Sequence, residues 1–223
     1  MLQEKWLKRV FEHAKHVDEY LANEGGKYQR VFTALYGSQN YGLATEASDV
    51  DTRSVVVPTF ETLALKGNSF KKELTLDNEK VVVLSFADLL AELRKGSPQA
   101  VELLDTQYVD VPVKFEKVYT RLVDRVYQLS HLAEAGYVRS VCGWLLSYLD
   151  QETEKAAARA DYLYKHLQGY LVEAECDFPA LGPCDKETLK SFLCLLKDKR
   201  YYGGNEGTDQ YLQELYLKAC RLV

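Results

Sequence analysis

The stretch that decides the fold reads Gly37-Ser38-Gln39-Asn40-Tyr41-Gly42, followed closely by Ser48-Asp49-Val50-Asp51. A β-branched and aromatic run, residues 31–36, precedes it and predicts a strand that ends at the Gly-Ser turn. Side chains two apart on a strand point to the same face, so Asp49 and Asp51 are expected to converge. Such a pair suits a divalent cation, and the small residues and backbone N–H groups of the turn suit a phosphate. The stretch therefore predicts a site for a metal-bound nucleoside triphosphate.

The carboxylate pair also has a simpler interpretation, as two solvated residues at the edge of a strand. The residues around it favour the functional one, because Val50 and the run 55–57 indicate that the pair opens a core strand. Two carboxylates at that position repel each other and lose hydration unless a cation compensates them. We therefore interpret Asp49 and Asp51 as metal ligands.

The composition limits the function classes. The 223 residues carry 28 basic and 33 acidic side chains, a net charge of −5, which argues against broad, non-specific binding to nucleic acid but permits a local basic groove. The five cysteines are odd in number and form no C-x-x-C pair, which favours reduced thiols. We expect neither a signal peptide nor a membrane span, and hence a cytoplasmic protein.

The order of periodic segments predicts an α+β fold: a small mixed β-sheet with helices, followed by an all-helical C-terminal domain. We expect a catalytic domain over residues 1–112 and a helical domain over 113–223. Strands are expected at 31–36, 50–57 and 81–84. Helices are expected at 2–23, 39–47, 86–95, 99–105, 116–128, 130–149, 152–175, 186–199 and 209–222. Ser85 is expected to cap the helix that begins at Phe86, with Asp88 in its first turn.

Two segments, residues 36–45 and 48–53, resemble the DNA polymerase β-type nucleotidyltransferase superfamily. They are most similar to the predicted nucleotidyltransferases related to the RNA-ligase-associated group, which occur in bacteria and phages. Further on, Leu93-Arg94-Lys95-Gly96-Ser97-Pro98 and Val101-Glu102-Leu103-Leu104 resemble that group's lysine-glycine-asparagine-proline and glutamate-leucine-leucine segments. Here Ser97 stands where asparagine is usual. The resemblance is strong over 30–58, fair over 80–105 and weak beyond.

The resemblance implies a metal-dependent transfer of a nucleoside monophosphate from an NTP to a hydroxyl acceptor, with release of pyrophosphate. Asp49 and Asp51 would hold Mg²⁺, with Mn²⁺ as the alternative. Gly37 and Ser38 would hold the triphosphate, and Ser48 would orient the carboxylate loop. Arg53 would either reach a phosphate or form an outward salt bridge. The acceptor would be an RNA end, including tRNA, a protein or a small molecule.

Active members of this superfamily usually carry a third carboxylate on a neighbouring strand, where it helps to activate the acceptor hydroxyl. The expected strand at residues 81–84 has no acid, and the nearest candidates are Glu79 and Asp77 just before it. We choose Glu79 as the third catalytic residue, with a plain turn residue as the competing interpretation.

Relatives often carry a lysine-x-x-x-histidine-x-x-arginine run on a C-terminal helix. The comparable segment here, residues 155–162, keeps Lys155 and has Arg159 and Tyr162 in place of the histidine and arginine. Lys155 and Arg159 are four residues apart and share a helix face, so they are candidates for contact with the base or the triphosphate. A solvated basic stripe is the alternative.

Two other functions stay open on the sequence. One is a nucleotide-binding or partner-binding module that keeps the fold and has lost catalysis, which the missing acid motivates. The other is a protein adenylyltransferase similar to the antitoxins of related fold that attach AMP to a partner toxin. The long helical half favours a separate acceptor-binding domain, for RNA or a small molecule.

Overall fold

The computed structural model describes residues 2–37, 39, 40, 44, 48–131, 134–151 and 153–173, together with residues 187, 190, 193 and 194. The chain divides into two compact units, residues 1–132 and 133–223. We had placed the division after residue 112, but the helix that follows belongs to the first unit. Its Tyr119 ring packs edge-on against Phe32 of the sheet, with 5.0 Å between ring centroids.

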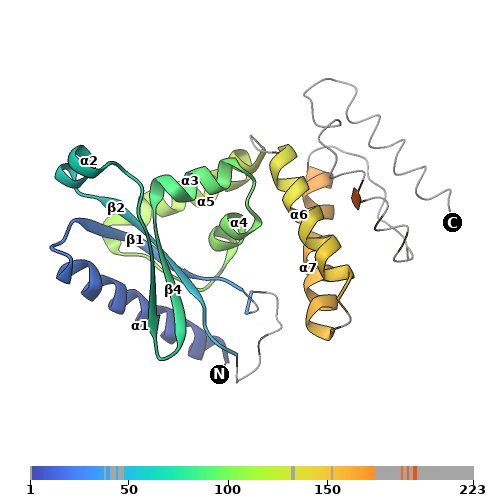
Figure 1. Cartoon of the computed structure of the whole chain (residues 1–223), viewed down its shortest axis with the longest axis horizontal. Coiled ribbons are helices and arrows are strands. Elements are labelled where there is room, and N and C mark those ends of the chain that lie inside the picture. The colour runs from blue at the N-terminus through green and yellow to red at the C-terminus, as the bar shows by residue number, and fades with distance from the viewer. Residues whose placement is uncertain are drawn as a thin grey trace. The chain divides into compact units, whose positions relative to one another are not determined.

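The first unit combines a sheet with helices (Figure 1), as the α+β prediction requires. Its elements follow in chain order as α1 (Leu2–Asn23), β1 (Tyr28–Leu35), β2 (Thr52–Pro58), α2 (Phe60–Lys66), β3 (Lys71–Leu76), β4 (Glu79–Ser85), α3 (Phe86–Arg94), α4 (Pro98–Asp105), β5 (Val109–Asp110), the 3₁₀ helix η1 (Val113–Phe115) and α5 (Glu116–His131). The second unit contains α6 (Glu134–Leu149) and α7 (Glu154–Glu173). The expected strands and helices of the first unit are present, apart from the expected helix at 39–47, whose described residues include a turn at Gln39 and Asn40.

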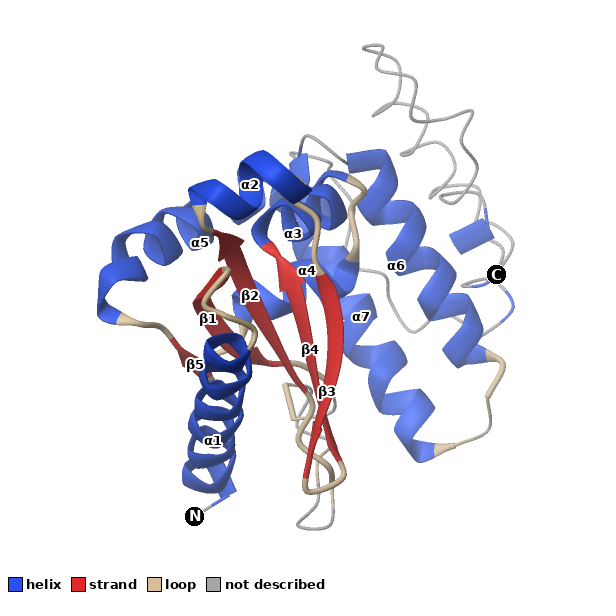
Figure 2. Cartoon of the chain, turned by 60° about the vertical axis from the view of Figure 1, so that its left-hand side comes forward, coloured by secondary structure: helices blue, strands red, loops and turns tan. Residues whose placement is uncertain are grey.

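The five strands form one mixed sheet in the order β3-β4-β2-β1-β5 (Figure 2). β2 lies in the middle, antiparallel to β1 and parallel to β4. In register, Leu35 of β1 and Val81 of β4 both pair with Thr52, the first residue of β2. The end of β1, the start of β2 and the start of β4 therefore meet at one edge of the sheet.

Side chains of β2 alternate between the two faces of the sheet. The Thr52 hydroxyl contacts His13 of α1 at 2.9 Å, and Val56 packs with Val17 of the same helix. Arg53 points the other way and pairs with Glu92 of α3 at 3.1 Å. Even-numbered residues of β2 thus face α1, and odd-numbered residues face the side that α3 and α4 cover.

Helix α1 covers one face of the sheet because its apolar residues recur at helical spacing. Trp6, Val10, Ala14, Val17 and Leu21 are all buried. Steps of three and four residues put these side chains on a single stripe of the helix. Each large apolar side chain contributes about 1.5–3 kcal/mol when fully buried, so this stripe holds α1 in place.

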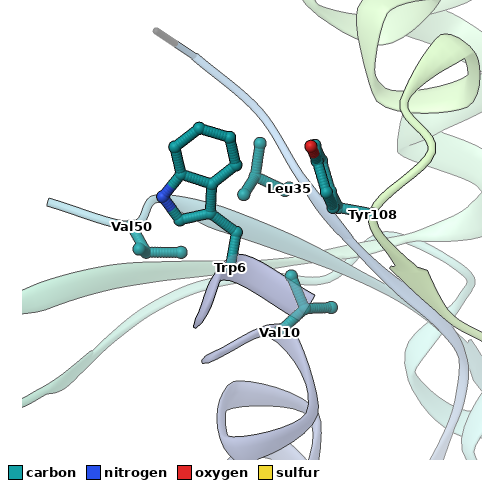
Figure 3. Close-up of a cluster of buried hydrophobic side chains, with 5 residues drawn as sticks. All are labelled: Trp6, Val10, Leu35, Val50 and Tyr108. Carbon is teal, nitrogen blue, oxygen red and sulfur yellow. The ribbon is translucent and has the colours of Figure 1, made fainter. Parts of the chain in front are cut away.

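At one end of that stripe, α1 packs against the start of β2 (Figure 3). Val50 lies in a cluster with Trp6, Val10, Leu35 and Tyr108. The rings of Trp6 and Tyr108 meet edge to face, with 5.6 Å between centroids. The residue between the two candidate metal ligands is therefore part of the core.

Helix α3 begins as expected from the sequence. The Ser85 hydroxyl accepts a hydrogen bond from the Asp88 backbone N–H at 3.0 Å, which confirms Ser85 as the cap. The Asp88 carboxylate in turn accepts from the hydroxyls of Ser85 and Ser69 and from the backbone N–H of Phe70. This arrangement fixes α3 directly after β4 and over the odd-numbered side of β2.

The second unit is helical where the structure describes it. Helices α6 and α7 pack against each other through buried side chains, namely Val141, Cys142 and Leu145 on α6 and Ala156, Ala160 and Leu163 on α7. The expected helix at 209–222 and most of the one at 186–199 lie outside the described residues. Among the helices described, none has the length and apolar character that a membrane crossing requires.

Candidate functional site

The candidate site forms where the chain leaves β1 and enters β2. The Tyr36 backbone N–H donates to the Asp51 carbonyl at 3.1 Å, which continues the ladder one residue beyond both strands. The Gln39 side-chain amide donates to the Asp49 carbonyl. Gly37 lies between them at φ +108°, a left-handed conformation that glycine adopts without strain from a Cβ atom. The glycine turn and the carboxylate pair, distant by some ten residues in sequence, are thus neighbours in space.

Glu102 of α4 holds the turn in this shape. One of its carboxylate oxygens accepts from the Gly37 backbone N–H at 2.6 Å and from the Asn40 side-chain amide at 3.1 Å. The same Asn40 amide reaches the Leu35 carbonyl at 3.2 Å, and its oxygen accepts from the Thr106 hydroxyl at 2.8 Å. The Gly37 N–H, which we had assigned to the triphosphate, therefore donates to a side chain of the protein itself.

The sequence contained a signal for this role. Glu102 stands among Val101, Leu103 and Leu104 in an apolar run, and only 7% of its surface is exposed. A carboxylate at the centre of such a run must meet fixed hydrogen-bond donors, because an unpaired buried charge is costly. Glu102 was quoted only as part of a resemblance, and its function in shaping the turn was missed.

We expect Glu102→Ala to lower the free energy of unfolding by about 2 kcal/mol, because it leaves the Gly37 N–H without its acceptor and removes one of the two acceptors of the Asn40 amide. Glu102→Gln keeps an acceptor oxygen of the same reach and should lose less than half of that amount. Urea unfolding of both variants checks this. Equal losses for alanine and glutamine would show that the acceptor is not what matters at this position.

Asp49 and Asp51 differ in their surroundings. Asp49 is exposed, whereas Asp51 is half-buried. Burial raises the pKa of Asp51 above its ordinary value of 3.8, and the charge of Asp49 raises it further. A hydrogen bond from the Lys80 backbone N–H and the charge of the Lys80 ammonium lower this pKa, but by less than burial and Asp49 raise it. The two negative charges therefore repel each other across a partly desolvated edge, and a cation bound between them would relieve that repulsion.

This donor set fits a divalent cation in charge and chemistry, because Mg²⁺ and Mn²⁺ prefer carboxylate oxygens. No group of three or more histidine, cysteine, aspartate or glutamate side chains with metal-binding geometry occurs in the described part of the chain. The remaining positions around a cation would accordingly fall to phosphate oxygens and water, as Mg²⁺ commonly has them.

Glu79 does not join Asp49 and Asp51 on their face of the sheet. Its carboxylate accepts from the Val50 backbone N–H at 3.1 Å, from Arg9 at 2.6 Å and from His13 at 3.0 Å. Arg9 and His13 both belong to α1, on the even-numbered side of β2. We expected Glu79 as the third catalytic carboxylate, and the structure instead places it as a support under the backbone that carries the pair.

His13 completes this support from inside the core. It is fully buried, and burial lowers its pKa more than the nearby Glu79 charge raises it, so the ring is neutral at pH 7. The carboxylate of Glu79 only accepts, so Nε2 carries the proton and Nδ1 accepts from the Thr52 hydroxyl. His13 of α1 therefore bonds Thr52 directly and is linked to the Val50 backbone through Glu79, on the two sides of Asp51.

Of the two roles expected for Arg53, phosphate contact or salt bridge, the structure shows a salt bridge. Its guanidinium pairs with Glu92 at 3.1 Å, donates to the Gln99 side chain at 2.5 Å and lies over the Tyr36 ring, 4.8 Å from the centroid. Arg53 is only 8% exposed, and its Nε has no hydrogen-bond partner among the described residues. Arg53 thus ties β2 to α3 and α4 behind the site, and its assignment to a phosphate remains a prediction.

Comparisons with known proteins assign this chain to no family. No protein-family model matches the chain, and no curated protein does so either. A solved structure described as a nucleotidyltransferase-like protein from Exiguobacterium sibiricum 255-15 is similar over 92% of this chain and 71% of its own, with 13% identity and a TM-score of 0.35. That score carries no inference about fold or function, and both rest on the residues and contacts above.

For four of the expected site residues the structure gives less information about a role in the site. Ser38 lies outside the described residues, and Ser48 is half-buried in the segment before Asp49. Lys155 belongs to α7, and its side chain lies outside the described part. Arg159 lies over the Tyr148 ring of α6 at 5.5 Å, within the second unit. The structure brings together Gly37, Asp49 and Asp51, and the roles of Lys155 and Arg159 toward a nucleotide remain predictions.

Proposed function

We propose that this protein is a metal-dependent nucleotidyltransferase that moves a nucleoside monophosphate from an NTP to a hydroxyl acceptor and releases pyrophosphate. The observation that carries the proposal is the pair Asp49 and Asp51, in the segment that leads into the core strand β2 beside the Gly37 turn. A structural role for the pair is disfavoured, because burial and mutual repulsion raise the pKa of Asp51. Such an arrangement is unfavourable for folding and useful for binding a cation.

In this proposal the residues of the chain bind and orient the substrate. Asp49 and Asp51 hold a Mg²⁺ or Mn²⁺ ion, and Ser38 with the turn around it receives the triphosphate. When bound, the ion neutralises phosphate charge that develops on the leaving group. The acceptor oxygen bonds to the α-phosphorus, the bond to the bridging oxygen of pyrophosphate breaks, and the hydroxyl proton passes to water. Ser48 and the Glu79 support keep the two carboxylates in place.

The experiment is a transfer assay with purified protein, Mg²⁺ and each α-labelled NTP, offered total RNA including tRNA, a protein extract and small-molecule acceptors. We expect label on one acceptor class and stoichiometric pyrophosphate. The double variant Asp49→Asn with Asp51→Asn should lose both while keeping its circular dichroism spectrum. Unchanged transfer in a folded double variant would refute the assignment.

A second candidate, a nucleotide-binding module without turnover, is favoured by one observation. In β4, the residues that face the same side as Asp51 are Lys80, Val82 and Leu84, none of them an acid. This candidate predicts that calorimetry detects NTP with Mg²⁺ while no acceptor yields pyrophosphate. Measurable pyrophosphate with any acceptor decides for the enzyme, and transfer to a protein would point to the antitoxin-like adenylyltransferase.

A further inference from the structure

Lys80 is the β4 residue beside Asp51 on the same face of the sheet. Thr52 of β2 pairs with Val81 of β4 across the parallel strands. The residues just before them, Asp51 and Lys80, therefore lie next to each other. Thr52 contacts α1, and Val81 packs in the cluster with Val17 of that helix, so the residues before them face the opposite side. The Asp51 carboxylate also accepts the Lys80 backbone N–H.

The Lys80 ammonium is part of the electrostatics of this face. It pairs with Glu73 of β3 at 3.2 Å, and the charge of Asp51 acts on it as well. A lysine ammonium is charged at neutral pH, at which aspartate carboxylates are ionised. The β4 residue beside Asp51 on this face is therefore a base and not a third carboxylate.

The other charges near the pair are already balanced. Glu79, whose charge also acts on Asp51, is paired with Arg9 at 2.6 Å on the opposite face. Glu92 is paired with Arg53. Asp49 and Asp51, by contrast, form no ion pair with another described residue, and the Lys80 charge acts on Asp51.

We propose that this site holds a single divalent cation, because the β4 residue beside Asp51 is Lys80 and not a carboxylate that could bind a second one. The proposal rests on the proposed function and narrows it. Two dications in a shared site stand about 3.5–4 Å apart and need several carboxylates to offset their repulsion. Two aspartates beside a lysine carry enough negative charge to bind one dication, and the triphosphate also coordinates that ion.

The experiment counts bound Mn²⁺ by electron paramagnetic resonance, with protein and a non-hydrolysable NTP analogue in equal amounts. We expect one bound Mn²⁺ per complex, without the spin coupling that two neighbouring ions produce. Lys80→Asp supplies a third carboxylate and should bind two coupled ions. Lys72→Asp is the matched control, an exposed β3 lysine paired with Val83, and should bind one.

The outcomes separate the two proposals. Two coupled ions in the unaltered protein would overturn the single-cation site while supporting the proposed function. Lys80→Asp remaining at one ion, with an unchanged circular dichroism spectrum, would overturn the role given to Lys80. No bound Mn²⁺ beyond that held by the analogue alone would overturn the proposed function itself.

Discussion

Asp51→Asn should reduce transfer at least about a hundredfold and at the same time make the cation-free protein more stable. The loss follows because asparagine offers the cation a neutral oxygen in place of a charged one. The gain follows because Asp51 is half-buried and close to Asp49, so its charged form is unfavourable in the folded chain. A residue kept for binding commonly destabilises the fold in this way.

The pH dependence of unfolding gives the sign of the change in stability that Asp51→Asn causes. Burial and Asp49 raise the pKa of Asp51 in the folded chain above its ordinary value of 3.8. Between these two pKa values the folded chain binds more protons than the unfolded chain, so the free energy of unfolding falls as the pH rises. Above this window the destabilisation is complete, and Asp51→Asn removes it. Urea unfolding at pH 7 in EDTA should therefore favour the variant.

Asp88→Asn is the matched control with the opposite sign. Partial burial acts against ionisation of Asp88, but hydrogen bonds from Ser85, Phe70 and Ser69 lower its pKa overall. Ionised Asp88 stabilises the folded chain above the ordinary pKa of aspartate, and this stabilisation is lost as the pH falls through the pKa of Asp88 in the folded chain. Asp88→Asn should therefore destabilise at pH 7. If Asp51→Asn also destabilised in EDTA, the electrostatic account of the pair would be wrong.

Glu79→Ala should lower the free energy of unfolding by about 3 kcal/mol, a large part of the total stability of an ordinary domain. It removes the acceptor of Arg9, of buried His13 and of the Val50 backbone N–H together. Glu73→Ala, an exposed ion pair on the neighbouring strand, should change stability by less than about 1 kcal/mol. Thermal or urea unfolding of the two variants measures the difference.

Glu79→Gln separates the supporting role from a catalytic one. Glutamine keeps an oxygen for the Val50 N–H and loses the charge that Arg9 requires. A support predicts a clear loss of stability with most of the transfer rate retained in the folded fraction. A third metal ligand predicts the reverse, a stable protein with transfer abolished, and that result would restore the original expectation for Glu79.

The sequence predicted the strands that are buried and missed those that are not. β1, β2 and β4 consist of apolar, β-branched runs because helices and neighbouring strands cover them. β3 is an edge strand whose charged residues are mostly exposed, and β5 has two residues, so neither leaves such a pattern. α2, a helix of seven residues, is equally short for a periodic signal.

The site was predictable to the extent that it depends on one strand. The two-residue spacing of Asp49 and Asp51, in the extended segment that leads into β2, predicts that they share a face whatever the rest of the fold does. The side to which Glu79 points depends on the register between β2 and β4, which neither segment specifies alone. The same holds for Glu102, whose partner Gly37 lies 65 residues away. Contacts between distant segments therefore decide which acids shape the site and which bind at it.

Val50, which packs against Trp6 and lies between the two carboxylates, has a consequence for heat inactivation. A site carried on a surface loop commonly loosens at a temperature below that at which the domain unfolds. Here the Val50 segment cannot loosen without exposing the Trp6 cluster and breaking the hydrogen bond to Glu79. Activity measured against temperature should therefore fall along the same curve as the unfolding of the first unit, with no earlier step.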